Sequence, residues 1–121
     1  MKRILIIDDE PDVAESLCLV LEAAGYAADK IMNASAALDI AKDYDLLLLD
    51  LLMPKFSGRQ FLAEMQARKI EVPVIVLSAA MLTNEISAEL RRDYGEKIVL
   101  VPKTSAHSNL LPEIEKKIGK P

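Results

Sequence analysis

Residues 45–50 have the sequence Asp-Leu-Leu-Leu-Leu-Asp, and this stretch decides the fold of the chain. Four consecutive leucines without polar alternation are typical of a β-strand that is apolar on both faces. Such a strand belongs in the middle of a parallel sheet that helices cover on both sides. Asp50 ends the apolar run, and in open α/β sheets ligands bind beyond the carboxyl ends of the strands. An isolated aspartate at such a position would more often simply start a turn.

Other segments of the chain alternate between strand-like and helix-like patterns. Further strands are expected at residues 4–7, 26–32, 72–77 and 98–101. Helices are expected to open at Pro11, after Asn33, after Gly58, after Thr83 and near Ser108. Alternating strands and helices predict a doubly wound α/β fold, a three-layer sandwich with a five-stranded parallel sheet in its middle. Segments 4–7, 46–49 and 72–77 are the most uniformly apolar and should be central, whereas Pro102 favours an edge position for the last strand.

The length, charge and composition of the chain exclude several classes of function. A chain of 121 residues is expected to be one domain over residues 1–121, without an output module. The net charge of −4 and the lack of a basic stripe argue against direct nucleic-acid binding. No apolar run reaches the length of a membrane span, so a cytoplasmic protein without membrane contacts is expected. Cys18 lies in a helical pattern and is expected to be a small buried hydrophobe.

Polar side chains follow each strand that we place in the centre of the sheet. They are Asp8, Asp9 and Glu10 after the first strand, Asp50 after the third, Ser78 after the fourth and, beyond the edge strand, Lys103. Carboxylates that converge on one edge repel one another unless they hold a hard cation such as Mg²⁺. A hydroxyl and an ammonium opposite them would complete a cradle for a phosphoryl group. A carboxylate can itself be the nucleophile, and Asp50 is the best placed of these acids.

The order and spacing of these motifs resemble a response-regulator receiver domain along essentially the whole chain. The motifs are Asp-Asp-Glu at 8–10, Asp50 with Met53-Pro54 and Gly58 behind it, Ser78-Ala79 and the late Lys103. The resemblance implies a flavodoxin-like sheet with the strand order 2-1-3-4-5. It also implies a signalling switch in a two-component phosphorelay rather than an enzyme with a substrate of its own.

The resemblance further implies a role for each site residue. Asp50 would accept a phosphoryl group from a sensor histidine kinase or a histidine phosphotransfer protein, and the change would be passed to an unknown downstream effector. Asp9 would bind Mg²⁺ directly and Asp8 through water, while Asp50 and the backbone carbonyl of Leu52 would complete the protein ligands. Ser78 would bond to a phosphoryl oxygen, and Lys103 would pair with Asp50 and then with the phosphate.

The chain departs from the pattern of the family at three places. Thr104 follows the lysine where the family usually has proline, and Pro102 precedes it. The interval between Ser78 and Lys103 is slightly longer than usual. Leu100 occupies a position where the family typically carries an aromatic residue that switches between two states. We therefore expect signalling to proceed through the segment after Ser78 and the helix that follows it, with little rearrangement of Leu100.

Four other functions remain as alternatives. A pseudo-receiver that binds partners without phosphorylation is the strongest, although such proteins usually lose an acid or the lysine. A haloacid-dehalogenase-type phosphatase would need Asp-x-Asp after its first strand, whereas Asp8 and Asp9 are adjacent. A flavodoxin-like cofactor binder would need a glycine- or hydroxyl-rich loop there instead of acids. His107 could suggest a phosphocarrier, but it lies in a polar stretch expected to precede the last helix, at the surface.

Overall fold

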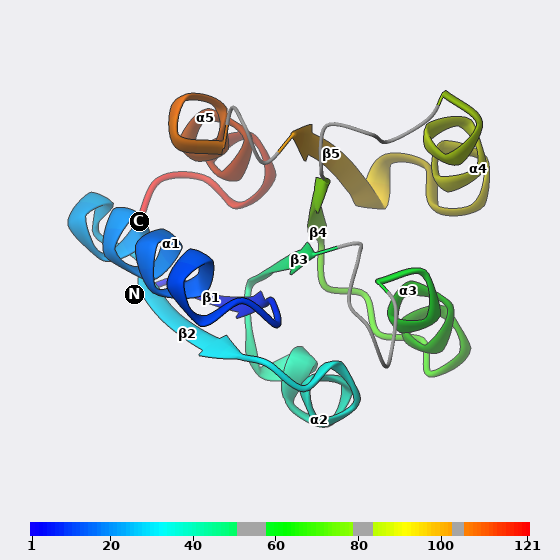
Figure 1. Cartoon of the computed structure of the whole chain (residues 1–121), viewed down its shortest axis with the longest axis horizontal. Coiled ribbons are helices and arrows are strands. Elements are labelled where there is room, and N and C mark those ends of the chain that lie inside the picture. The colour runs from blue at the N-terminus through cyan, green and yellow to red at the C-terminus, as the bar shows by residue number, and fades with distance from the viewer. Residues whose placement is uncertain (51–57, 79–83, 103–105) are drawn as a thin grey trace.

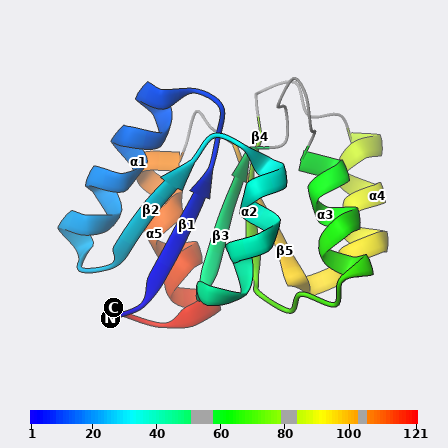
Figure 2. The same ribbon diagram turned by 90° about the horizontal axis from the view of Figure 1, so that it is seen from below.

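The computed structural model describes residues 1–50, 58–78, 84–102 and 106–121. The described part is a five-stranded parallel sheet with the strand order β2-β1-β3-β4-β5. Helices α1 and α5 cover one face, and α2, α3 and α4 cover the other (Figures 1 and 2). The predicted three-layer fold, its central strands and its two edge strands are confirmed. The elements are β1 (Arg3–Ile7), α1 (Pro11–Ala24), β2 (Ala27–Ile31), α2 (Ala34–Ile40), η1 (Ala41–Asp43), β3 (Leu46–Asp50), α3 (Gly58–Ala67), β4 (Val74–Ser78), α4 (Asn84–Tyr94), η2 (Gly95–Lys97), β5 (Ile98–Pro102) and α5 (Ala106–Ile118).

The leucines of β3 contribute to two separate hydrophobic cores, because successive side chains of a strand point to opposite faces. Leu47 and Leu49 pack on the face of α2, α3 and α4. Leu46 and Leu48 pack on the face of α1 and α5. All four leucines are completely buried, which explains why the strand has no polar alternation. Among the residues whose burial is described, helices α1 and α5 contribute to the second core the buried side chains of Ala14, Leu17, Cys18, Leu21, Leu110 and Ile114.

The structure corrects several details of the predicted elements. Strand β4 begins at Val74 rather than residue 72, and the carbonyl of Pro73 just before it accepts a hydrogen bond from Leu47 N at 3.0 Å. Helix α5 begins at Ala106, so His107 lies within that helix rather than before it. The sequence pattern predicts that this helix buries Leu111, Ile114 and Ile118. Ile114 is buried, but Leu111 and Ile118 are only partly buried, and Leu110 is buried instead. Across the described ranges, no helix has both the length and the apolar composition needed to cross a bilayer.

Helix caps account for two further boundaries. Asn33 caps α2 as predicted, since its side chain accepts a hydrogen bond from Ala36 N at 3.1 Å. Gly25 ends α1 with φ of 105°, a left-handed conformation that glycine adopts without strain. The amide of Tyr26 then bonds to the carbonyl of Leu21 at 3.0 Å, so Tyr26 belongs to the helix cap and not to β2. The predicted cap residue Thr83 lies outside the described residues.

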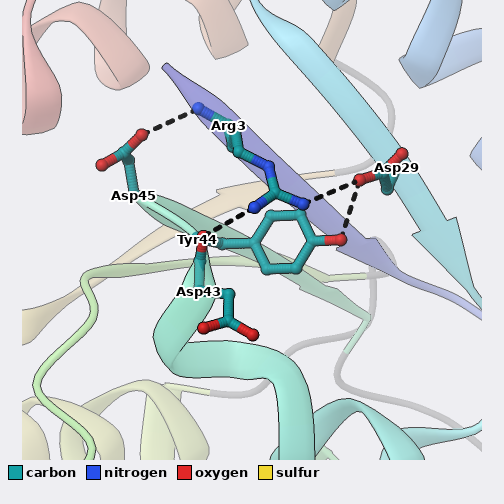
Figure 3. Close-up of polar contacts among 5 residues, drawn as sticks. All are labelled: Arg3, Asp29, Asp43, Tyr44 and Asp45. Carbon is teal, nitrogen blue, oxygen red and sulfur yellow. Dashed lines mark hydrogen bonds and ion pairs between the residues drawn. The ribbon is translucent and has the colours of Figure 1, made fainter. Parts of the chain in front are cut away.

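Arg3 joins β1 to β2 and to the segment that precedes β3, as Figure 3 shows. Its backbone N–H donates to Asp45 Oδ2 at 2.8 Å, and its guanidinium donates to the carbonyl of Asp43 at 3.3 Å. The guanidinium also lies 3.7 Å from Asp29 Oδ2 and 4.5 Å from the centre of the Tyr44 ring. Tyr44 donates to Asp29 at 2.8 Å, and burial together with this bond raises the pKa of Tyr44. These contacts hold the amino ends of the strands together, opposite their carboxyl ends.

Two side chains, one from the residue before β1 and one from the residue before β2, also cap the last helix. The ammonium of Lys2 donates to the carbonyl of Ile118, and the hydroxyl of Tyr26 donates to the carbonyl of Gly119 at 2.9 Å. The last carbonyls of a helix have no partner within the helix itself. These two bonds therefore tie the end of α5 to β1 and α1.

Replacing Tyr26 by phenylalanine should lower the free energy of unfolding by about 1 kcal/mol at pH 7, because one partly buried hydrogen bond is lost. Burial, and then the negative charge of Glu115, raise the pKa of Tyr26. The stabilising bond needs the protonated hydroxyl, so it is fully present below the ordinary tyrosine pKa of about 10 and lost as pH rises through the higher folded value. Urea unfolding of the native protein and of Tyr26→Phe, at neutral and at strongly alkaline pH, measures the difference in their free energies of unfolding. A difference that is absent at pH 7, or unchanged at alkaline pH, contradicts the assignment.

Candidate functional site

The pairing of β1 with β3 brings Asp8 beside Asp50. Ile7 at the end of β1 pairs with Leu49 in β3, so the next residue of each strand reaches the same level of the sheet. Both residues are at the carboxyl edge of the two central strands, where a doubly wound sheet binds its ligands. Their side chains are almost completely buried, with exposed fractions of 0% for Asp8 and 2% for Asp50. Carboxylates are rarely this buried unless they are paired or bind a cation.

Four carboxylates meet at this edge. Ligand oxygens of Asp8, Asp9, Glu10 and Asp50 all lie within 4.8 Å of one another. Asp9 is partly buried and Glu10 is exposed, so the cluster runs from the interior to the surface. Glu10 belongs to the acidic run at residues 8–10 but was not predicted to be a ligand. The run of three consecutive acids was the signal that could have included it.

The start of α1 holds the acids of the first strand in place. The amide of Asp8 donates to the carbonyl of Ile31 at the end of β2, at 3.2 Å. The side chain of Asp8 accepts a hydrogen bond from Glu10 N at 2.9 Å. Glu10 is the extended N-cap residue of α1, and Pro11 is the first helical residue. The acids thus lie at the positive end of the dipole of α1, which favours negative charge.

The donor set of this cluster fits a hard divalent cation. Its ligands are all carboxylate oxygens, which Mg²⁺ and Ca²⁺ prefer over nitrogen or sulfur. Mg²⁺ characteristically uses one or two carboxylates and keeps several of its waters, and the exposed side of the cluster leaves access for water. Asp8, Asp9 and Asp50, which were predicted as magnesium ligands, all belong to this cluster, and their binding of the ion stays a prediction.

The remaining predicted site residues belong to the same edge of the sheet by sequence. Ser78 is the last residue of β4, where its neighbour Leu77 pairs with Asp50 and Ser78 itself pairs with Pro102. Only the backbone of Ser78 is described. Lys103 directly follows Pro102, and Leu52 follows Asp50 by two residues; both lie outside the described residues, as does Thr104. The structure therefore brings together the predicted acids, and the roles of these acids stay predictions, as do those of Ser78, Lys103 and Leu52.

Comparison with known proteins assigns the family. Residues 4–111 match the family model of the response regulator receiver domain. The chain belongs to this family. The resemblance inferred from the acids and strand ends is thus confirmed for nearly the whole receiver domain, and the order of its five strands is that of the family's flavodoxin-like fold.

Individual relatives support the same assignment. The receiver domain is 34% identical over 83 residues to the transcriptional regulatory protein DltR of Streptococcus agalactiae, covering 67% of this chain and 37% of that protein. It is 31% identical over 80 residues to the response regulator SaeR of Staphylococcus aureus, covering 65% of this chain and 35% of that protein. The chain therefore spans little more than a third of the length of these curated relatives.

Solved structures with the same fold include response regulators from Thermotoga maritima and Francisella. The response regulator protein TrrA of Thermotoga maritima, solved in complex with Mg²⁺-BeF, has a TM-score of 0.79 and 30% identity, covering 96% of this chain and 98% of its own. A Francisella response-regulator receiver domain has a TM-score of 0.86 at 22% identity, covering 98% of this chain and 97% of its own. At 22% identity, the similarity to the Francisella domain shows a shared fold and nothing more.

Proposed function

We propose that this receiver domain is a phosphorylation switch whose acceptor is Asp50. The observation that carries the proposal is the position of Asp50. It ends the central strand β3, is 2% exposed, and shares a carboxylate cluster with the acids that follow β1. A carboxylate held in such a site is a suitable nucleophile for phosphorus, because neighbouring groups can offset the charge that develops on the phosphoryl oxygens.

The chemical step is a transfer between two protein side chains. A carboxylate oxygen of Asp50 attacks the phosphorus of a phosphohistidine, the phosphorus–nitrogen bond breaks, and the imidazole leaves with a proton taken from solvent. The product is an acyl phosphate on Asp50. Such a transfer requires positioning and charge neutralisation more than covalent catalysis by further residues.

A magnesium ion would be held by Asp9 directly, by Asp8 through water, by Asp50 and by the backbone carbonyl of Leu52. When bound, the ion supplies positive charge that offsets the carboxylates and the incoming phosphoryl oxygens. Asp8 orients this set, since its side chain is fixed by the amide of Glu10. Ser78 would donate to a phosphoryl oxygen, and Lys103 would supply a second positive charge on the other side. Ser78 ends β4, and Lys103 follows Pro102 of β5 in the sequence, which supports these roles.

The family supports a sensor histidine kinase or histidine phosphotransfer protein as the phosphoryl donor. DltR and SaeR carry the names of a transcriptional regulatory protein and a response regulator, which supports an effector or output module downstream of the receiver. We propose residues 1–121 as one receiver unit acting in the cytoplasm, without nucleic-acid contacts of its own. Leu100 lies partly buried on the edge strand β5, and a small response at this position on phosphorylation remains our expectation.

Incubation with acetyl phosphate or phosphoramidate, followed by intact-mass measurement, tests the proposed function. In the presence of Mg²⁺ we expect a single adduct of about 80 Da, the mass of one phosphoryl group. Chelation with EDTA should prevent its formation. If no adduct forms with either donor or with a panel of phosphorylated histidine phosphotransfer proteins, the chain is a pseudo-receiver. An adduct that forms equally in EDTA contradicts the role of the metal.

Magnesium should stabilise the folded protein, and Asp9→Asn should weaken this effect. A ligand at 100 times its dissociation constant adds about 2.7 kcal/mol to the free energy of unfolding. Removing one direct carboxylate ligand should raise the dissociation constant about tenfold or more, by analogy with the loss of other metal-site contacts. Thermal unfolding of the metal-free proteins during a Mg²⁺ titration measures the dissociation constant of the native protein and that of Asp9→Asn. Asp43→Asn, which changes an exposed acid outside the cluster, should leave the constant unchanged.

A further inference from the structure

A small cavity lies at the edge of the sheet opposite the acids. It has a volume of about 100 Å³ and opens between the ends of α3 and α4 and the first residues of β4 and β5. Because the strands are parallel, their first residues are at the far edge from Asp8 and Asp50. The floor and walls are apolar and consist of Leu62, Met65, Ile70, Val72, Val74 and Ile98.

The exposed and partly buried polar residues of the lining, here called the mouth of the cavity, include groups of both charge signs. Gln66 comes from α3, Asp93 and Tyr94 come from the end of α4, and Lys97 comes from η2. The ammonium of Lys97 lies 3.2 Å from a carboxylate oxygen of Glu71, so its charge is already balanced. Burial, and then the negative charge of Asp93, raise the pKa of Tyr94, which keeps its hydroxyl protonated. The mouth therefore offers hydrogen-bond donors and acceptors, and neither positive nor negative charge dominates there.

We propose that this cavity is a binding site for a small uncharged molecule that is mainly apolar and carries one hydroxyl group. The apolar walls exclude a charged ligand, because its desolvation would not be repaid inside the cavity. The mixed charges at the mouth match a neutral group that both donates and accepts. A cavity of about 150 Å³ accommodates benzene, so the ligand here is no larger than a single small ring or a branched short-chain alcohol.

Packing gives such a ligand its binding energy. Side chains that border an empty space lose dispersion contacts on that side, and a ligand of matching size restores them. The ligand would contact α3 and α4 at once, at the ends of these helices that lie far from the acidic cluster. Arg59 and Glu89 already join the two helices through an ion pair of 2.6 Å. Binding would add an apolar contact between them near Tyr94, where α4 ends.

Methyl NMR with isobutanol and cyclopentanol as the probes tests the site. We expect saturable shifts at the methyl groups of Met65, Ile70 and Ile98, at millimolar concentrations of the probe. The methyl groups of Leu17 and Ile114, in the core on the other face of the sheet, are the internal control and should not shift. Shifts that rise linearly without saturation, or that are equal in both cores, overturn the proposal.

Two variants make the test specific to the cavity. Val74 is 2% exposed and lines the space, so Val74→Phe should fill it and weaken binding of both alcohols at least tenfold while the other core keeps its spectrum. Met65→Ala should enlarge the space and increase the affinity for benzene at least tenfold over the native protein. Native-like binding in a folded Val74→Phe protein, or no gain of benzene affinity in Met65→Ala, contradicts the proposal.

Discussion

Asp50→Asn should abolish the phosphoryl adduct and at the same time make the metal-free protein more stable. The adduct is lost because an amide does not replace the carboxylate as nucleophile. Stability should rise because four acids lie within 4.8 Å of one another, and two like charges at that separation repel by about 3 kcal/mol at an effective dielectric constant of 20. Other charges near the site and solvent reduce this value. We expect the free energy of unfolding to increase by about 1 to 3 kcal/mol in urea unfolding at pH 7 with EDTA.

A matched control separates this effect from the removal of any negative charge. Asp43 is an exposed acid outside the cluster, and Asp43→Asn should keep the adduct and change the stability by no more than about 0.5 kcal/mol. Saturating Mg²⁺ should narrow the stability gap between the native protein and Asp50→Asn, because the ion neutralises the same repulsion. An adduct that persists in Asp50→Asn shows that another residue is the acceptor. Loss of stability in that variant shows that the charge of Asp50 is satisfied within the fold.

Phe61→Ala should cost about 3 to 5 kcal/mol of folding free energy, the largest effect that we expect from one substitution in the core. Phe61 is completely buried in α3 and packs in the core shared by α2, α3, α4 and the sheet. Truncating it removes an aromatic ring from close-packed surroundings and leaves a space that helices cannot fully close. With urea m-values of about 1–3 kcal/mol/M, the midpoint of unfolding should fall by about 2 M.

Phe61→Leu provides the comparison, since it keeps most of the apolar volume at this position. Its expected cost is about 1 to 1.5 kcal/mol, in the range of shape changes within a core. Phe61 lies one turn into α3, and the segment between Asp50 and α3 connects this helix to the proposed acceptor. We therefore expect Phe61→Ala also to slow phosphorylation at temperatures where the protein remains folded. A loss of less than 1 kcal/mol in Phe61→Ala would contradict the packing of α3 on the sheet.

The alternation of elements and the uniformly apolar strands were sufficient to predict the architecture. The leucines of β3 predicted a strand buried on both faces, and they are buried there. Pro102 predicted an edge strand, and β5 is an edge strand. The convergence of Asp8 and Asp50 was also predictable, because parallel strands bring their carboxyl ends to one edge of a sheet. These predictions succeeded because they rest on strand direction and side-chain alternation, which local sequence determines.

Features that depend on contacts between distant segments were not predicted. The bond between Arg3 and Asp45 joins residues far apart in the chain, and no local pattern marks it. The choice of Leu110 rather than Leu111 as the buried residue depends on where α5 begins and how it rotates against the sheet. Tyr26 was assigned to the predicted strand at residues 26–32, whereas its amide closes the cap of α1. In each case tertiary packing overrides a local preference.

The four leucines of β3 do not encode their own alignment with the neighbouring strands. Sliding the strand by one residue would exchange the two faces, yet every leucine would still meet an apolar core, so hydrophobicity alone hardly distinguishes the slipped states. The charged residues at both ends make the difference: Asp45 is held by the amide of Arg3, and Asp50 must remain at the edge. The register of a strand whose apolar residues are all alike is therefore specified by the acids that flank it. Asp50, the residue proposed as phosphoryl acceptor, thus also helps to fix the register of β3, the strand that carries it.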